Sequence, residues 1–290
     1  MKTTFLAILL SISTALSASA QTKFKILSYN VLKGLQQDSL NINRYISWVN
    51  KLDPDMVAYQ EMNGFTQKSL EDLSHRYRHP YALQSKLEGF PVALSSKTPL
   101  VDFRKVTENM WHSYIYAKVK GLNVFVIHFS PFSYKKRQEE VTNIIAQAKA
   151  LPANEPILIM GDFNSLDAAD SAQYDATVVK PMLAAEKKEA HIRNLNNGQV
   201  DYTVLKALKD AGFKDSFWLS NKTFKHSVPT SKDGNGQIGK NTEKKGKRID
   251  YLWVNDAASR LVTKSDIIHD EDTHILSDHY PVYVELTLSR

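Results

Sequence analysis

The chain has 290 residues, of which 42% are hydrophobic and 23% are charged, and it contains no cysteine. This hydrophobic fraction is typical of a globular protein with a sizeable core. The absence of cysteine excludes disulfides, thiolate metal sites and a lipid anchor on an N-terminal cysteine. The formal net charge of +6 slightly favours an anionic partner.

The N-terminal segment has the pattern of a secretory signal peptide. A positive start at Lys2 is followed by an apolar stretch from Phe5, and the small residues Ser17–Ala20 form a cleavage pattern. The apolar stretch is short for a transmembrane helix, although an uncleaved membrane anchor is the alternative. We predict a signal peptide at 1–20, a single domain at 22–290, and a secreted or periplasmic protein without a membrane span after cleavage. Cleavage would remove Lys2 and leave a net charge of +5.

Periodicity predicts alternating strands and helices in the remaining chain. Short apolar runs rich in β-branched and aromatic residues indicate strands, and apolar residues at helical spacing indicate helices. In chain order, the sequence predicts a strand at Phe24–Leu27, a helix at Ser39–Leu52, a strand at Met56–Tyr59, a helix at Phe65–Leu73, a strand at Phe90–Ser95, a hairpin of Ser113–Val119 and Leu122–His128, a helix at Tyr134–Leu151, a strand at Ile157–Met160, a helix at Tyr202–Gly212, and strands at Tyr251–Val254 and Tyr280–Leu288.

The segment Thr230–Lys247 is the clearest loop, because it holds four glycines, five lysines and almost no apolar residues. We interpret it as a mobile insertion within one domain, the alternative being a domain linker. Its lysines from Lys240 lead into Arg248 and Asp250, so the loop either meets a phosphate backbone or is simply a solvated surface.

Six short polar clusters each adjoin an apolar run. They are Ser28-Tyr29-Asn30, Gln60-Glu61, His128, Gly161-Asp162-Phe163-Asn164, Arg248-Ile249-Asp250 and Ser277-Asp278-His279. Carboxylates, amides and imidazoles placed repeatedly at strand edges converge on a site more easily than on a core. Hard oxygen ligands suit a divalent cation, and histidines and asparagines suit a phosphate ester.

The order of these six clusters resembles the endonuclease/exonuclease/phosphatase superfamily. That superfamily includes deoxyribonuclease I, abasic-site endonucleases, neutral sphingomyelinases and inositol polyphosphate 5-phosphatases. The resemblance runs from about Lys23 to Arg290, and it rests on the ordered set because each motif alone is weak. It implies an α/β fold, a four-layer sandwich in which helices flank two packed mixed β-sheets, with the site at one edge of the sheets.

The resemblance also implies a metal site. Glu61 would be the main ligand, and Asn30 and Asp278 would complete the environment directly or through water. The expected ion is Mg²⁺ or Mn²⁺, with Ca²⁺ as an alternative, because hard cations take oxygen ligands. The competing readings are a surface carboxylate, a turn asparagine and a capping aspartate.

Five further residues would carry the chemistry. The resemblance implies that Asp162 orients or activates the attacking water and that Asn164 holds a phosphoryl oxygen or Asp162 itself. Positions two apart face the same side of an extended chain, so both can point at one phosphate, although an Asx-type turn is the alternative. Asp250 would pair with His279, which acts as general base or phosphate ligand, and His128 would stabilise charge or protonate the leaving oxygen.

Two positions depart from the abasic-endonuclease branch, which has Asn in place of His128 and Tyr in place of Phe125. The chemistry is therefore expected to be closer to the branch that carries histidine. The remaining histidines that match no motif are taken as structural or surface residues: His112, His191, His226, His269 and His274.

The sequence leaves the substrate class open. The favoured hypothesis is a nuclease-like phosphodiesterase acting on nucleic acid, as a monomer without a stable protein partner. The alternative is a phosphodiesterase or phosphatase acting on phospholipid headgroups or sugar phosphates, for which Trp111–Tyr116 would be an exposed aromatic hairpin rather than a buried strand. A non-catalytic binding protein is disfavoured because Glu61, Asp162 and His279 are all present.

Overall fold

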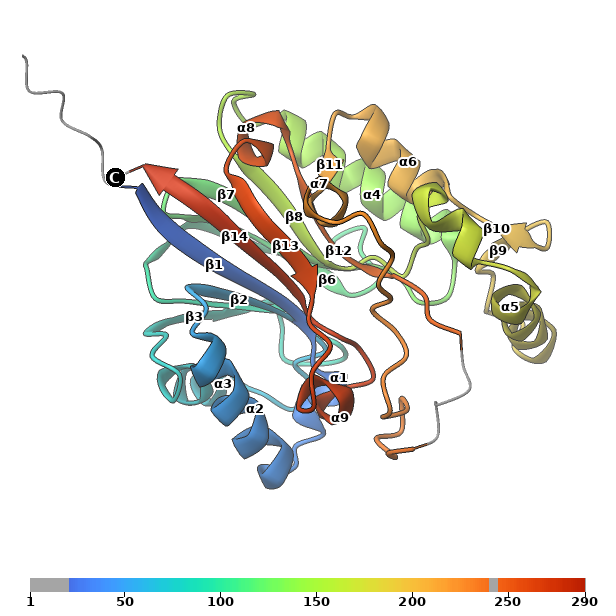
Figure 1. Ribbon diagram of the computed structural model, residues 1–290, viewed down its shortest axis with the longest axis horizontal. Coiled ribbons are helices and arrows are strands. Elements are labelled where there is room, and N and C mark those ends of the chain that lie inside the picture. The colour runs from blue at the N-terminus through green and yellow to red at the C-terminus, as the bar shows by residue number, and fades with distance from the viewer. Residues whose placement is uncertain (1–20, 240–244, 290) are drawn as a thin grey trace, which may run out of the picture.

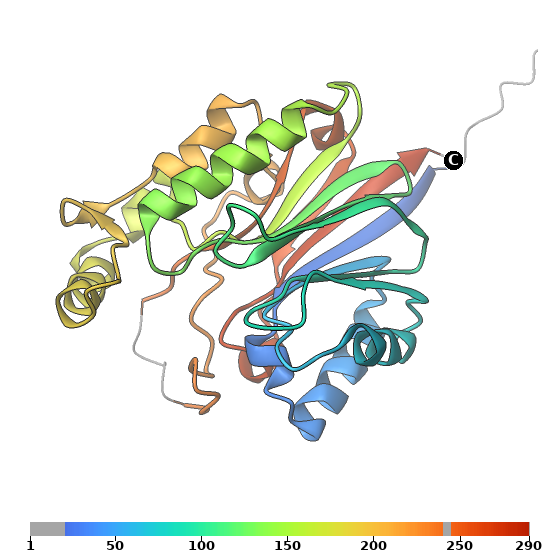
Figure 2. The same ribbon diagram turned by 180° about the vertical axis from the view of Figure 1, so that it is seen from behind.

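The computed structural model describes residues 21–239 and 245–289. Two six-stranded mixed sheets pack face to face, and helices cover their outer faces (Figure 1; Figure 2). The predicted four-layer sandwich is confirmed. The predicted signal peptide lies outside the described residues. Within the ranges given above, no helix is long and apolar enough to cross a membrane.

The first sheet contains both ends of the described chain. Its strands β1 and β2 are parallel, and its other neighbouring strands are antiparallel. In spatial order its members are β13 (Val262–Ile267), β14 (Val282–Ser289), β1 (Gln21–Asn30), β2 (Met56–Gln60), β4 (Ala93–Ser96) and β3 (Tyr81–Gln84).

The second sheet is built from the middle of the chain. Its strands β7 and β8 are parallel, and its other neighbours are antiparallel. In spatial order its members are β11 (Lys214–Asp215), β12 (Asp250–Val254), β8 (Ile157–Asp162), β7 (Leu122–His128), β6 (Ser113–Val119) and β5 (Leu100–Val106). A separate short hairpin consists of β9 (Leu195–Asn196) and β10 (Gln199–Val200).

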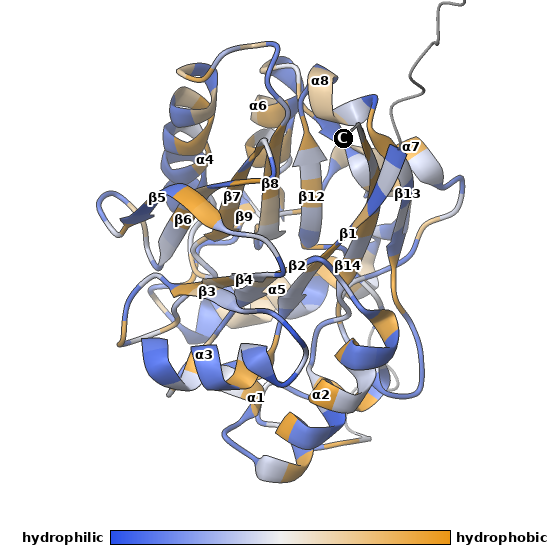
Figure 3. Cartoon of the chain, turned by 90° about the vertical axis from the view of Figure 1, so that its left-hand side faces the viewer, coloured by the Kyte–Doolittle hydropathy of each residue, from blue (hydrophilic) through white to orange (hydrophobic). Residues whose placement is uncertain are grey.

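The helices form the outer layers and several connections. Within the described residues they are α1 (Leu32–Leu35), α2 (Ser39–Leu52), α3 (Gln67–His75), α4 (Tyr134–Lys149), the 3₁₀ helix η1 (Ala168–Gln173), α5 (Ala176–Lys188), α6 (Thr203–Asp210), α7 (Ser216–Ser220), α8 (Asp256–Ser259) and α9 (Thr273–Leu276). In Figure 3 the outer helices show polar residues toward solvent, whereas the strands carry much of the apolar colour.

Three apolar clusters hold the layers together. The central cluster joins the inner faces of the two sheets, for example through Ile26 of β1 and Leu158 of β8. A second cluster packs α2 and α3 on the first sheet, with Trp48 among its residues. A third packs α4 and α6 on the second sheet, with Ile144 and Leu205 among its residues. Both sheets are therefore covered on both faces, which explains why their strands read as continuous apolar runs.

The elements with complete local signals were predicted closely. The helix α2 has the predicted bounds because the Asp38 side chain accepts from the Leu40 backbone N–H at its start, and Asp53-Pro54 ends it. The hairpin of β6 and β7 also has its predicted bounds. Its turn residues Lys120 and Gly121 both have positive φ, as a two-residue turn of this twist requires.

Elements without such signals were missed. The sequence pattern did not predict β3, β5, β13 or α5. Most of β5 is exposed, so no alternation with a core marks it. The helix α5 contains Pro181 and buries only Val178, so its apolar period is weak.

Two further expectations are corrected. The segment from Thr230 is not freely exposed at its start, since Thr230 and Lys232 are buried. The Thr230 hydroxyl donates to the Ser277 carbonyl at 2.6 Å, which fixes this part of the loop. The run Trp111–Tyr116 is not an exposed hairpin, because Tyr114 and Tyr116 pack into the core between the second sheet and its helices.

Candidate active site

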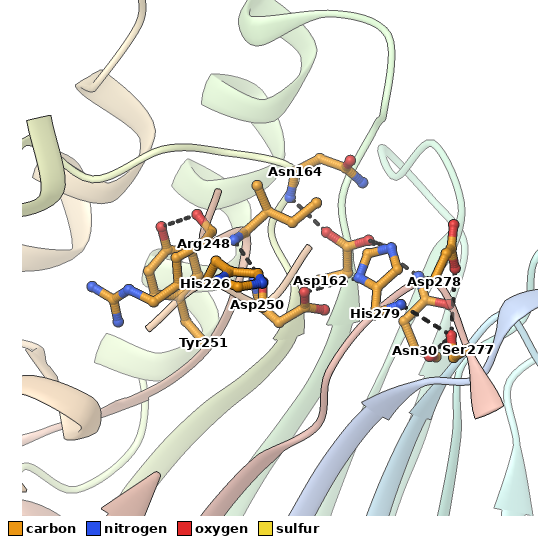
Figure 4. A network of polar contacts seen from close by, with 12 residues as sticks. Asn30, Asp162, Asn164, His226, Arg248, Asp250, Tyr251, Ser277, Asp278 and His279 are labelled. Atoms are coloured by element: carbon orange, nitrogen blue, oxygen red, sulfur yellow. Dashed lines mark hydrogen bonds and ion pairs between the residues drawn. The ribbon is translucent and has the colours of Figure 1, made fainter. Parts of the chain in front are cut away.

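Four strands bring the predicted polar residues to one edge of the sandwich. In the second sheet, His128 pairs in register with Asp162, and Asp162 with Asp250, so three site residues lie side by side. Asn30 ends β1 in the first sheet and is paired with Gln60. Figure 4 shows Asn30, Asp162 and Asp250 converging from different strands. The ends of these strands therefore meet at one edge of the sandwich, as the motif pattern predicted.

Gly161 permits the close approach of β7 and β8 at this edge. Its φ is +141°, and an added Cβ would lie 2.0 Å from the Ile127 carbonyl oxygen. Any side chain here would push apart the two strands that end in His128 and Asp162. The glycine in the fourth motif is thus required by packing and positions the catalytic edge.

Asp162 occupies the centre of the site. One carboxylate oxygen accepts from the Asn164 backbone N–H at 2.8 Å, and the other accepts from the Asn30 amide at 3.2 Å. The same second oxygen lies 3.6 Å from His128 Nε2 and 3.9 Å from His279 Nε2. Burial, and next the neighbouring Asp250 carboxylate, raise the pKa of Asp162 to about 7. A carboxylate held in this way is suited to exchange a proton near neutral pH.

Glu61 follows β2 in a left-handed conformation, with a φ of +62°. Its two carboxylate oxygens accept from the Asn30 amide at 3.3 Å and from the Lys33 backbone N–H at 3.0 Å. The pKa of Glu61 is raised, chiefly because its carboxylate is buried. The Asn30 amide contacts both Glu61 and Asp162, so it couples the two carboxylates of the two sheets.

The predicted pairing of Asp250 with His279 is present in the structure. His279 Nδ1 lies 2.8 Å from Asp250 Oδ2, which leaves Nε2 directed toward Asp162. Burial lowers the pKa of His279, but the carboxylates of Asp250 and Asp278 outweigh it and hold the pKa well above its usual value. The imidazole is therefore a cation that faces the centre of the site.

His128 differs from His279 because its Nε2 lies 3.6 Å from the Asp162 carboxylate, which is longer than a hydrogen bond. Its Nδ1 is buried without a hydrogen-bond partner in the described part of the chain. Its ring stacks on His112, with centroids 4.2 Å apart. Burial and this neighbouring ring lower the pKa of His128 well below its usual value, so His128 is neutral.

The sequence analysis did not assign His112 to the site. His112 is buried and lines the same pocket as His128. A usable signal was present, because the predicted hairpin pairs Ser113 with His128 and so places the preceding residue at the same strand end.

The turn after β8 differs from the extended chain that was predicted. Asn164 has a φ of +48°, and the Asp162 side chain accepts its backbone N–H, which makes the Asx-type turn named as the alternative. Both side chains still line the pocket, while Phe163 is buried in the core. Asp278 lies at the rim, where the Ser277 hydroxyl donates to it at 3.4 Å.

One group of side chains offers closely spaced ligand atoms for a metal ion. Among residues 21–239 and 245–289, the carboxylates and imidazole of Asp162, Asp250 and His279 offer ligand atoms within 4.8 Å of one another. Within this group Asp250 Oδ2 is already hydrogen-bonded to His279 Nδ1. The set expected from the sequence, Asn30, Glu61 and Asp278, stays a prediction.

A pocket of about 480 Å³ opens over these residues. One wall consists of Glu61, His128, Asp162, Asn164 and His279. Its other lining residues are Lys86, Gly89, Phe90, Trp111, His112, Pro131 and Phe132. The volume lies within the range of sites that hold small molecules or one group of a larger substrate.

The basic loop is described only in part. Lys240 and Lys244 lie outside the described residues, and Lys245 forms an ion pair with Asp175 at 2.7 Å. The predicted contact of this loop with a phosphate backbone therefore stays a prediction.

A family model described as the Endonuclease/Exonuclease/phosphatase family matches residues 27–279. The chain belongs to this family. It is accordingly a phosphoesterase of the endonuclease/exonuclease/phosphatase type, as the resemblance implied. No curated protein matches the chain in sequence.

Solved structures of this family share the fold. An AP endonuclease from Archaeoglobus fulgidus is 18% identical, with a TM-score of 0.64 over 90% of this chain and 98% of that chain. A 3′ phosphatase from Neisseria bound to a product DNA hairpin is 20% identical, with a TM-score of 0.64 over 91% and 99%. A 3′–5′ exonuclease from Neisseria meningitidis is 21% identical, with a TM-score of 0.62 over 91% and 99%.

Proposed function

We infer that this phosphoesterase is an exported, divalent-metal-dependent phosphodiesterase that cleaves nucleic acid. The observation that carries the proposal is the excess of negative charge at the site. The carboxylates of Glu61, Asp162, Asp250 and Asp278 converge there, and among the described residues the imidazolium of His279 is the cation that faces Asp162 and Asp250. A divalent cation would balance this negative charge and would allow a phosphate group to bind at the site.

The metal would be held on the Glu61 side. Glu61 would be its principal ligand, with Asn30 and Asp278 contributing directly or through water, and Mg²⁺ is the ion that best suits few carboxylates and several waters. When bound, the ion supplies Lewis-acid stabilisation of the charge on the phosphoryl oxygens.

The protein residues would divide the remaining work. Asp162, fixed by Asn30 and the Asn164 N–H, orients the attacking water and takes its proton as the water oxygen bonds to phosphorus and the bond to the leaving oxygen breaks. The leaving oxygen takes a proton from solvent water. The cationic His279, held by Asp250, binds a phosphoryl oxygen through Nε2. His128 is neutral, so it stabilises the transition state as a hydrogen-bond donor rather than as a proton donor.

Nucleic acid is the proposed substrate on two grounds. The net charge of the chain is +6, and the structural neighbours above include enzymes named for acting on nucleic acid, one of them bound to a DNA hairpin. Export is proposed from the pattern at 1–20.

The test is a panel of substrates with and without EDTA. Bis-p-nitrophenyl phosphate, plasmid DNA, RNA, sphingomyelin and inositol phosphates are compared in Mg²⁺, in Mn²⁺ and after chelation. We expect cleavage of DNA or RNA that stops with EDTA and returns with Mg²⁺. Glu61→Gln should lose this activity, whereas Glu139→Gln, on the exposed face of α4, should keep it. Full activity in EDTA contradicts the metal, and turnover of sphingomyelin alone contradicts the nucleic-acid substrate.

A further inference from the structure

The pocket has a second wall that the chemistry at the phosphate does not use. Lys86, Phe90, Trp111 and Phe132 line the same pocket as the carboxylates of Glu61 and Asp162 and the imidazoles of His128 and His279. They come from the segments before β4, before β6 and after β7. A group bonded to a phosphate held by the carboxylates and imidazoles would therefore lie near these residues.

This wall is aromatic and partly open. The rings of Trp111 and Phe132 meet edge to face, with centroids 5.4 Å apart, and Phe132 makes the same kind of contact with His191 at 4.9 Å. Trp111 nevertheless keeps 51% of its surface exposed, which is unusual for a large aromatic residue of a pocket. Phe90 is half-buried against His112, with centroids 5.3 Å apart. Exposed ring surface of this kind is suited to stack against another planar ring.

The wall is held in place by a buried carboxylate. Glu140 of α4 is fully buried, and its two oxygens accept from the backbone N–H groups of Trp111 at 2.7 Å and Ser130 at 2.8 Å. The Asn194 amide donates to the Pro131 carbonyl at 2.8 Å, which fixes the segment that carries Phe132. The aromatic residues are thus presented on fixed backbone, and binding costs little ordering of the loops.

The positive charge of Lys86 restricts which planar group can bind at this wall. Its ammonium donates to the His112 carbonyl at 2.8 Å and remains beside the pocket. A cation at this wall repels a quaternary ammonium headgroup, which aromatic walls otherwise accept. It favours a ligand that combines a neutral planar ring with an anion.

We propose that the wall of Lys86, Phe90, Trp111 and Phe132 binds the nucleoside next to the scissile phosphate, with its base stacked on Trp111. This subsite rests on the proposed phosphodiesterase activity and names the part of the substrate that it selects. Base stacking on an aromatic side chain tolerates any sequence, so the subsite selects nucleotides without selecting a base.

The experiment compares two substrates that differ only in the nucleoside. Thymidine 5′-p-nitrophenyl phosphate and methyl p-nitrophenyl phosphate release the same chromophore, and the ratio of their kcat/KM values measures the nucleoside contribution. We expect a preference for the thymidine ester that falls roughly tenfold in Trp111→Ala, as for loss of one stacked base. The matched control is Phe103→Ala, because Phe103 is 52% exposed on β5 and does not line this pocket. That variant should keep the wild-type ratio.

Three results bear on the proposal in different ways. Equal kcat/KM values for the two esters in the wild type overturn the subsite and leave the phosphodiesterase intact. Faster cleavage of p-nitrophenylphosphorylcholine that is lost in Trp111→Ala overturns it in favour of a choline headgroup. Calorimetric titration with thymidine monophosphate and methyl phosphate tests the subsite without turnover. Tighter binding of the nucleotide than of methyl phosphate, if it is lost in Trp111→Ala, supports the subsite even when no ester is cleaved. Absence of cleavage contradicts the proposed function and not the subsite.

Discussion

Arg248 and Asp250 stand two residues apart in one motif, yet they belong to two buried polar clusters of opposite character. The Arg248 guanidinium donates to Asp170 and Asp215 outside the site. All four oxygens of these two carboxylates accept hydrogen bonds, including those from the Trp218 indole at 3.1 Å and the Phe217 backbone at 3.0 Å. Asp250 faces the site, where its ion pair is with the imidazole of His279.

The difference lies in how far the charges of each cluster are paired within the protein. Burial lowers the pKa of Arg248, but Asp215, Tyr251 and Asp170 more than reverse this and raise it above its ordinary value. Arg248 Nη2 makes no hydrogen bond within the described residues, but it lies 2.8 Å from Asp170 Oδ2, so the guanidinium is ion-paired inside its cluster. At the site, the pKa of Asp162 is raised, and His128 Nδ1 and both polar atoms of the Gln60 amide have no hydrogen-bond partner within the described residues. Buried polar groups left in this state are costly, and such cost is characteristic of sites that await a ligand.

The largest expected effect separates activity from stability at the site. Asp162→Asn should lower kcat by about 10²–10⁴-fold, because it removes the group that handles the proton of the water. The same change should stabilise the metal-free fold. The folded-state pKa of about 7 exceeds the unfolded value of 3.8, so the folded state binds more protons between these values and stability falls as pH rises through them.

Removing this carboxylate should therefore raise the free energy of unfolding at pH 8 by up to about 4 kcal/mol, with little change at pH 4. Urea unfolding in EDTA at both pH values, together with kcat in Mg²⁺, measures the two effects. Loss of stability at pH 8 would show that Asp162 is a structural anchor like Asp170.

The reverse outcome is expected in the Arg248 cluster. Arg248→Met leaves the carboxylates of Asp170 and Asp215 buried without their cation, which should cost about 3–5 kcal/mol of stability. The kcat of the folded protein should change little, because the guanidinium faces away from the pocket. Arg260→Met removes an arginine of which 77% of the side chain is exposed, and it should cost less than about 1 kcal/mol. A large fall in kcat with unchanged stability would place Arg248 in the active site.

These two clusters also show what the sequence could and could not predict. The residues of the site lie at the ends of strands whose apolar runs are visible, so their convergence followed from the strand pattern. The partners of Arg248 lie 78 and 33 residues away, in segments where no period or motif marks them. The sequence did single out Trp111 as part of an exposed aromatic run, but it did not predict that Phe90 and Phe132 lie with it at one pocket. These residues belong to connections whose paths depend on tertiary contacts such as those of Glu140.

The smallest effect is expected at His79, a buried histidine. Its polar atoms are paired within the protein, as in the Arg248 cluster and unlike those of His128. His79 is fully buried, and both ring nitrogens are bonded, Nδ1 to the Ser95 hydroxyl at 3.0 Å and Nε2 to the Pro54 carbonyl at 2.9 Å. Burial lowers its pKa from 6.5 to about 4. Between these values the unfolded state binds more protons than the folded state, so this histidine adds stability above pH 6.5 that is lost as pH falls toward 4.

The wild type should gain about 2 kcal/mol in free energy of unfolding from His79 between pH 5 and pH 7.5. His79→Gln should lack this gain. Urea unfolding at the two pH values measures this difference, and any loss common to both reports the broken hydrogen bonds instead. His75→Gln, at the exposed end of α3, is the matched control for removing an imidazole. An unchanged pH dependence in His79→Gln would mean that this network admits a proton when folded, and the contrast between paired interior clusters and the open site would then rest on Arg248 alone.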